Sequence, residues 1–142
     1  MKNRKYTKEQ LTVGCYVDEN SGSADDCNRR TVEFARDYGF KPGHGWQADS
    51  ESLSWTGDAA VSYLNDLETR SFMSWSFEDN SLFLMADVDG AREDVGFVTG
   101  QDDLDEPPAS YRGEWLSVSD HGNATLYVRG ARGVDKEIWG VV

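Results

Sequence analysis

The hydrophobic positions of the chain recur first at a helical period of 3.6 residues and later at a strand period of two. Residues 24–38 predict an amphipathic helix that begins after Ser23, a good N-cap residue, and ends before Gly39. Asp25 and Asp26 fall in its first turn, where carboxylates suit the helix dipole. Its apolar face consists of Cys27, Thr31, Phe34, Ala35 and Tyr38.

A second helix is predicted over residues 51–67, after a loop that contains one proline and two glycines. Asp49 or Ser50 is expected to cap its start. Gly57 lies in its interior and weakens a helix by roughly 1 kcal/mol relative to alanine, so we expect it to permit a close crossing with a neighbouring element. The apolar positions of this helix are Leu53, Ala60, Leu64 and Leu67.

Segments that alternate between apolar and polar residues predict strands. Residues 11–17 form the first such segment, with Leu11, Val13, Cys15 and Val17 expected on one face. After Arg70 the alternation predicts a hairpin whose turn is residues 78–81. The remaining strands are expected at 111–119, 124–128 and 134–142.

These elements predict an α+β fold with one antiparallel sheet of about five strands and two helices packed on one of its faces. The length of 142 residues is typical of one domain, so we expect a single domain over residues 1–142. Residues 1–10 are basic and are expected to be a flexible lead-in.

Acidic residues dominate the composition. The chain has 26 acidic and 14 basic residues, a net charge of −12, and an isoelectric point near 4.4. This charge argues against binding nucleic acid through its phosphates and against anionic membrane surfaces. It favours a basic protein partner, cation binding, solubility alone, or adaptation to high salt. With two cysteines, no signal peptide and no run of ~18 apolar residues, we expect a cytoplasmic protein with reduced thiols.

The charge is concentrated between Asp87 and Glu106. This stretch contains eight acidic residues and one arginine, a net charge of −7. We expect a short edge strand at residues 95–98 and loop elsewhere. The candidate partner-binding residues are Asp89, Glu93, Asp94, Asp102, Asp103, Asp105 and Glu106. A solvated loop without a partner is the alternative interpretation.

Calcium binding is a further hypothesis for the first half of this stretch. Asp87, Asp89, Glu93 and Asp94 supply carboxylates, and Gly90 permits a turn. The spacing excludes an EF-hand, because Gly90 follows the second aspartate directly and position 96 is glycine rather than glutamate. No metal site and no cofactor are therefore assigned.

Motifs for catalysis are weak. The possible zinc ligands Cys15, Cys27, His44 and His121 include no closely spaced pair. The sequence has no nucleophile elbow, P-loop or dinucleotide fingerprint. We therefore expect a non-enzymatic protein and keep a small enzymatic domain as the alternative.

Two of the five tryptophans are candidates for a surface contact. Trp75, Trp115 and Trp139 lie in predicted strands and are expected in the core. Trp46 follows a glycine-rich loop and Trp55 lies near the start of the second predicted helix. Aromatic side chains at such positions are common anchors of protein interfaces.

About two thirds of the chain resembles small acidic proteins of phages and other mobile elements. The resemblance is carried by LSWTGDAAVSYLN at residues 53–65, by TVEFARDYGF and SWSFEDNSLFLM on either side, and by WLSVSDHGNATLYV. It implies an inhibitor of host defence, of the anti-CRISPR or anti-restriction type, that acts in the host cytoplasm. An acidic row of side chains that imitates nucleic-acid phosphates would block a basic nucleic-acid-binding surface. The expected partner is a nucleic-acid-binding component of host defence.

Overall fold

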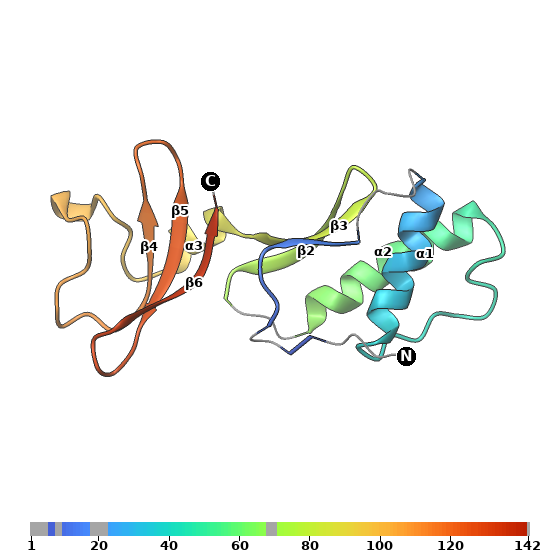
Figure 1. Ribbon diagram of the computed structural model, residues 1–142, viewed down its shortest axis with the longest axis horizontal. Coiled ribbons are helices and arrows are strands. Elements are labelled where there is room, and N and C mark those ends of the chain that lie inside the picture. The colour runs from blue at the N-terminus through green and yellow to red at the C-terminus, as the bar shows by residue number, and fades with distance from the viewer. Residues whose placement is uncertain (1–5, 8–9, 18–22, 68–70, 142) are drawn as a thin grey trace. The chain divides into compact units, whose positions relative to one another are not determined.

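The computed structural model describes residues 6–7, 10–17, 23–67 and 71–141. Most of the lead-in expected to be flexible, residues 1–5 and 8–9, lies outside these ranges. The described chain has an α+β fold, as predicted, and forms two compact units (Figure 1). The first unit comprises residues 1–69 and 74–85, and the second comprises residues 70–73 and 86–142. The single domain stays a prediction.

In its described residues, the first unit contains two helices and one three-stranded antiparallel sheet. Its helices are α1 (Ala24–Arg36) and α2 (Ser50–Asp66). Its strands, β1 (Gly14–Val17), β2 (Met73–Glu78) and β3 (Ser81–Ala86), are arranged in the order β1-β3-β2. The predicted turn of the β2–β3 hairpin is confirmed. Asp79 and Asn80 have φ angles of 50° and 60°, as a type I′ turn requires.

Both helices begin where the sequence predicts. The Ser23 side chain accepts a hydrogen bond from Asp26 N at 3.0 Å, and Asp49 Oδ1 accepts one from Ser52 N at 2.8 Å. Each side chain thus satisfies a backbone donor that the first helical turn leaves free. Gly57 is buried, and a Cβ built there would lie 2.1 Å from Asn28 Oδ1 on α1. The expected close crossing at Gly57 is confirmed.

The predicted shared face of residues 11–17 is wrong in part. Leu11 and Val17 are buried, but Cys15 is exposed. The pairing of β1 with β3 shifts its register between Cys15 and Val17, which is typical of a bulge. A bulge reverses which face later side chains occupy, and strict alternation does not anticipate it. Tyr16 therefore faces the core aromatic rings, with its ring centroid 5.2 Å from that of Trp75.

The second unit contains the helix α3 (Val88–Asp94), the 3-10 helix η2 (Gln101–Asp103) and three strands. Strands β4 (Gly113–Val118), β5 (Ala124–Arg129) and β6 (Asp135–Val141) form an antiparallel sheet in that order. Val98 adds a single parallel bridge to Leu116 on β4, in place of the expected edge strand. The hydrophobic core of this unit includes Ala91, Phe97, Trp115, Leu116, Leu126 and Trp139.

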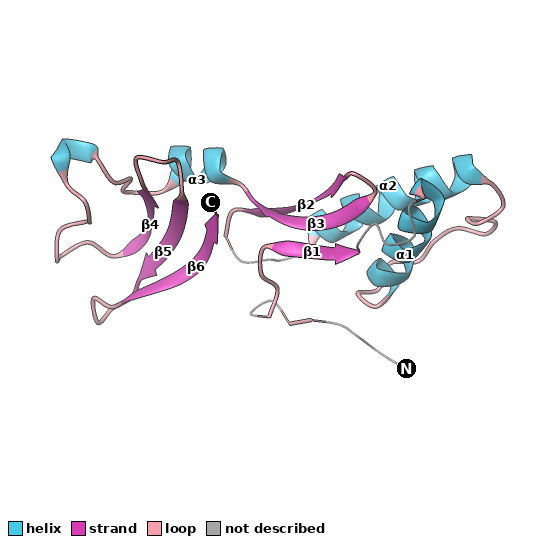
Figure 2. Ribbon diagram, turned by 45° about the horizontal axis from the view of Figure 1, so that its top comes forward, coloured by secondary structure: helices cyan, strands magenta, loops and turns pink. Residues whose placement is uncertain are grey.

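The six strands thus form two three-stranded sheets rather than one sheet of about five strands. Alternation identifies a strand and its buried face, but it does not identify the strands that pair. The segment between β3 and β4 contains α3 and η2. Strand β3 pairs with β1 from the start of the chain, whereas β5 pairs with its sequence neighbours β4 and β6. Figure 2 draws the strands of both sheets in magenta.

Candidate functional site: an anchored acidic loop

The first acidic run forms a helix instead of the expected loop. Asp87 is the N-cap of α3, and its Oδ1 accepts a hydrogen bond from Gly90 N at 3.0 Å. A Cβ at position 90 would lie 2.2 Å from Asp87 Oδ2, so glycine makes room for the capping carboxylate. The Asp87-Val88-Asp89-Gly90 motif is therefore the start of a helix. An aspartate whose side chain can accept from the backbone N–H three residues later is a usual signal of a helix N-terminus, and this signal could have identified α3.

The carboxylates of the calcium hypothesis do not gather into a site. Asp87 caps α3, and the side chains of Asp89, Glu93 and Asp94 are exposed along this short helix. Among the described residues, no group of three or more histidine, cysteine or acidic side chains could hold a metal ion. His44 and Cys27 lie in the first unit and His121 in the second, with Cys27 buried and both histidines exposed.

The second acidic run forms a small closed loop, residues 100–106. Gly100 N donates to Leu104 O at 2.8 Å, and Leu104 N donates to Gln101 O at 3.0 Å. All six residues from Gln101 to Glu106 are exposed. Asp102, Asp103, Asp105 and Glu106 flank Leu104 in sequence, and the Leu104 side chain is 41% exposed. We call residues 101–106 the acidic loop.

Two residues of the acidic loop have left-handed backbone conformations. The φ angles of Asp102 and Asp103 are 52° and 60°. This region costs most L-residues roughly 1–2 kcal/mol, but aspartate and asparagine tolerate it best because their short side chains hydrogen-bond locally. The residue type thus suits the turn, and any charge-altering substitution must respect this backbone.

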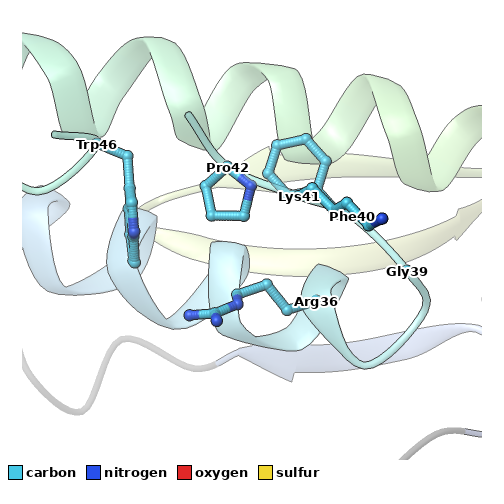
Figure 3. A pocket seen from close by; sticks show the side chains of 6 residues that line it. All are labelled: Arg36, Gly39, Phe40, Lys41, Pro42 and Trp46. Atoms are coloured by element: carbon cyan, nitrogen blue, oxygen red, sulfur yellow. The ribbon is translucent and has the colours of Figure 1, made fainter. Parts of the chain in front are cut away.

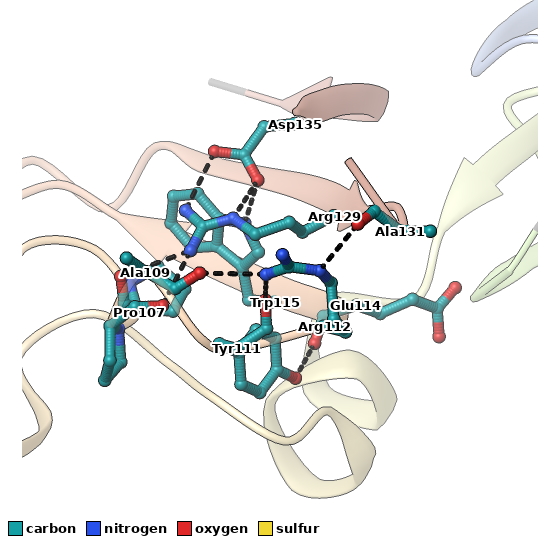
Figure 4. Close-up of polar contacts among 10 residues, drawn as sticks. Pro107, Ala109, Tyr111, Arg112, Glu114, Trp115, Arg129, Ala131 and Asp135 are labelled. Atoms are coloured by element: carbon teal, nitrogen blue, oxygen red, sulfur yellow. Dashed lines mark hydrogen bonds and ion pairs between the residues drawn. The ribbon is translucent and has the colours of Figure 1, made fainter. Parts of the chain in front are cut away.

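The sheet of the second unit anchors the acidic loop at both ends. Before the loop, Val118 N donates to Thr99 Oγ1 at 2.8 Å, and Thr99 N donates to Leu116 O at 2.9 Å. After the loop, Arg129 Nη1 on β5 donates to Pro108 O at 2.9 Å and to Pro107 O at 3.3 Å (Figure 4). Hydrogen bonds to the sheet thus fix the chain on both sides of the acidic loop.

Arg129 is itself held by Asp135 on β6. Arg129 Nε lies 2.8 Å from Asp135 Oδ1, Nη2 lies 3.1 Å from Oδ2, and the pair is therefore bidentate. Trp115 Nε1 donates to Asp135 Oδ1 at 3.0 Å. The hydrogen bonds from Arg129 keep the pKa of Asp135 below its usual value, and Asp135 raises the pKa of Arg129. Nothing in the spacing of residues 107, 129 and 135 predicts this network.

Arg112 and Tyr111 add further hydrogen bonds that anchor the chain after the acidic loop. Arg112 Nη1 donates to the carbonyls of Ala109 at 2.8 Å and Tyr111 at 2.7 Å, and its Nε donates to Ala131 O at 3.3 Å. The Tyr111 hydroxyl donates to Glu114 O. The chain leaving the acidic loop is thus tied to β4 and to the β5–β6 turn, as Figure 4 shows.

The acidic residues predicted to bind a partner fall into two groups. Asp102, Asp103, Asp105 and Glu106 share the acidic loop, whereas Asp89, Glu93 and Asp94 lie on α3. Figures 1 and 2 both show η2 and α3 apart, with β4 between them in each view. The two acidic runs therefore do not form one continuous row.

The predicted tryptophans come together in the first unit. Trp46 is half-buried, Trp55 is 68% exposed, and both line a hollow of ≈ 140 Å³ that His44 also borders. The tryptophans expected in the core, Trp75, Trp115 and Trp139, are all buried. The aromatic and acidic candidates thus belong to different compact units.

None of the helices in the described part of the chain is long and apolar enough to cross a membrane. Comparison of the chain with known protein families, with curated proteins and with solved structures found no match.

Proposed function

We propose that this protein is a non-enzymatic acidic binding protein whose acidic loop contacts a basic surface on another protein. The observation that supports this proposal is the exposed acidic loop, fixed at one end by Thr99 and at the other by Arg129. A fixed loop loses little conformational entropy on binding, so its charges contribute more to affinity than those of a mobile tail. Leu104 supplies an apolar contact among the charges.

The partner is proposed to be a nucleic-acid-binding protein of a host defence system, blocked in the host cytoplasm. Four carboxylates close together on a rigid loop offer the negative charge that a phosphate-binding surface accepts. The resemblance to acidic mobile-element inhibitors supports the same class of partner. The acids of α3, namely Asp89, Glu93 and Asp94, and the Trp46–Trp55 surface are proposed as secondary contacts.

The test compares two variants with the same net charge. Asp102→Asn/Asp103→Asn/Asp105→Asn removes three charges from the acidic loop, and asparagine tolerates the left-handed backbone at positions 102 and 103. Glu51→Gln/Asp58→Asn/Asp66→Asn removes three charges from exposed positions of α2. The measurement is capture of host proteins at about 50 mM and about 200 mM salt, with and without competing duplex DNA.

The proposal predicts a captured protein that is released by the higher salt, released by DNA, lost in the acidic-loop variant and retained in the α2 variant. Equal loss in both variants would show that only net charge matters. Capture that survives in the acidic-loop variant would contradict the proposal directly.

A further inference from the structure

A cavity in the first unit combines positive charge with flat apolar surfaces. It measures ≈ 440 Å³ and is lined by Arg36, Gly39, Phe40, Lys41, Pro42 and Trp46. Figure 3 shows Arg36 reaching from α1 toward the side that Trp46 and Pro42 border. The volume lies within the range of about 300–1,000 Å³ that is usual for small-molecule sites.

The segment that forms this cavity is held in place from both ends. At its start, the Tyr63 hydroxyl on α2 donates to Tyr38 O at 2.8 Å, and the ring centroids of Phe40 and Tyr63 are 5.5 Å apart. Gly39 has a φ of 102°, and a Cβ there would lie 2.8 Å from the Tyr63 hydroxyl oxygen. At its end, Arg29 Nε donates to Gln47 Oε1 at 3.3 Å. These contacts fix both ends of the segment that lines this surface cavity.

Arg36 has donors to offer a ligand. Its Nη1 pairs with Glu33 Oε1 at 3.1 Å, and both side chains are at least half exposed. An exposed pair of this kind contributes little free energy, so an incoming anion can compete with Glu33. The guanidinium also carries four further N–H donors in a planar fork that matches phosphate or carboxylate oxygens.

We propose that this cavity binds a small anion joined to a planar ring, of the nucleoside monophosphate class. Arg36, whose guanidinium Figure 3 shows on the side of Trp46 and Pro42, would contact the anionic group, and Trp46 and Pro42 would contact the ring face. Lys41, which extends in the other direction, would add positive charge at the rim. Stacking of a base on an aromatic side chain and pairing of phosphate with arginine are separate favourable terms that one ligand can satisfy together. This binding is independent of the acidic loop, which belongs to the other compact unit.

The experiment titrates the full chain with adenosine monophosphate, adenosine and inorganic phosphate, and follows the five tryptophan indole N–H signals by NMR. The Trp46 signal, identified by its loss in Trp46→Phe, should shift with the monophosphate, and adenosine or phosphate alone should bind about tenfold or more weakly. Lys41→Met should weaken monophosphate binding roughly fivefold, because one cation is lost.

Lys136→Met is the matched control, since it removes the same charge from an exposed position on β6 in the other unit. Its affinity for the monophosphate should stay within about twofold of the unaltered chain. The proposal would be overturned if the Trp46 signal did not shift at saturating monophosphate. It would also be overturned if Lys41→Met and Lys136→Met weakened binding equally, or if adenosine bound as tightly as its monophosphate.

Discussion

At the scale of single residues, Gly57 shows how one missing side chain sets the packing of two helices. Alanine at this position gains helix propensity of about 1 kcal/mol, but its Cβ would lie 2.1 Å from Asn28 Oδ1 and 3.2 Å from Asn28 Cβ. We expect Gly57→Ala to lower the free energy of unfolding by about 1–2 kcal/mol, because overpacking costs more than the propensity returns.

Removing the Asn28 side chain should remove this clash and with it the destabilising effect of Gly57→Ala. In an Asn28→Ala background, Gly57→Ala should instead be neutral or raise stability by up to about 1 kcal/mol. Urea unfolding of the four chains of this cycle measures the coupling. Equal effects of Gly57→Ala in both backgrounds would show that the two residues do not constrain each other.

The glycines also show what can be predicted from sequence at this scale. The role of Gly57 follows from its place inside a helical pattern, where glycine is unfavourable unless something approaches closely. The sequence equally allows Gly90 to serve a cation-binding turn, yet in the structure it makes room for the N-cap of α3. A carboxylate that could bind a cation and one that caps a helix look alike in sequence, because both favour aspartate before a turn.

At the scale of elements, Asn65 on α2 completes the edge strand β2. Trp75 N donates to Asn65 Oδ1 at 2.6 Å, and Asn65 Nδ2 donates to Trp75 O at 3.1 Å. The amide thus occupies the backbone groups with which another strand would pair. We expect Asn65→Ala to lower the free energy of unfolding by about 1–3 kcal/mol, since both groups of Trp75 lose their partner.

Asn65→Asp separates the two bonds, because a carboxylate can accept from Trp75 N but cannot donate to Trp75 O. Its loss of stability should therefore lie between those of the unaltered chain and Asn65→Ala. Thermal unfolding of the three proteins provides the comparison. An aspartate variant less stable than the alanine variant would contradict this account of the contact.

Elements were predicted well where they depend on neighbours in sequence, and poorly where they depend on distant ones. The caps of α1 and α2 and the turn at Asp79 and Asn80 are local features, and they lie where the sequence places them. The pairing of β1 with β3 and the anchoring of the acidic loop by Arg129 depend on contacts between residues more than 20 positions apart along the chain. Periodicity carries no information about such pairings.

At the scale of the whole molecule, net charge and the partly buried Arg129–Asp135 ion pair change stability in opposite directions as the pH falls. The net charge of −12 at pH 7 weakens the folded state by self-repulsion, which declines as the pH approaches the isoelectric point near 4.4. Asp135 has a folded-state pKa below its usual value, because Arg129 donates hydrogen bonds to its carboxylate. Its stabilising effect is therefore complete above the unfolded pKa of about 4 and disappears as the pH falls through the folded pKa.

We therefore expect the melting temperature to rise modestly between pH 7 and pH 5 and to fall below about pH 4. Asp135→Asn isolates the contribution of the ion pair. At pH 7 it should lower the melting temperature by several degrees, and this difference should shrink progressively below about pH 4, where the natural aspartate also becomes neutral. A difference that stays constant from neutral to acid pH would show that the contribution of Asp135 to stability does not depend on its charge.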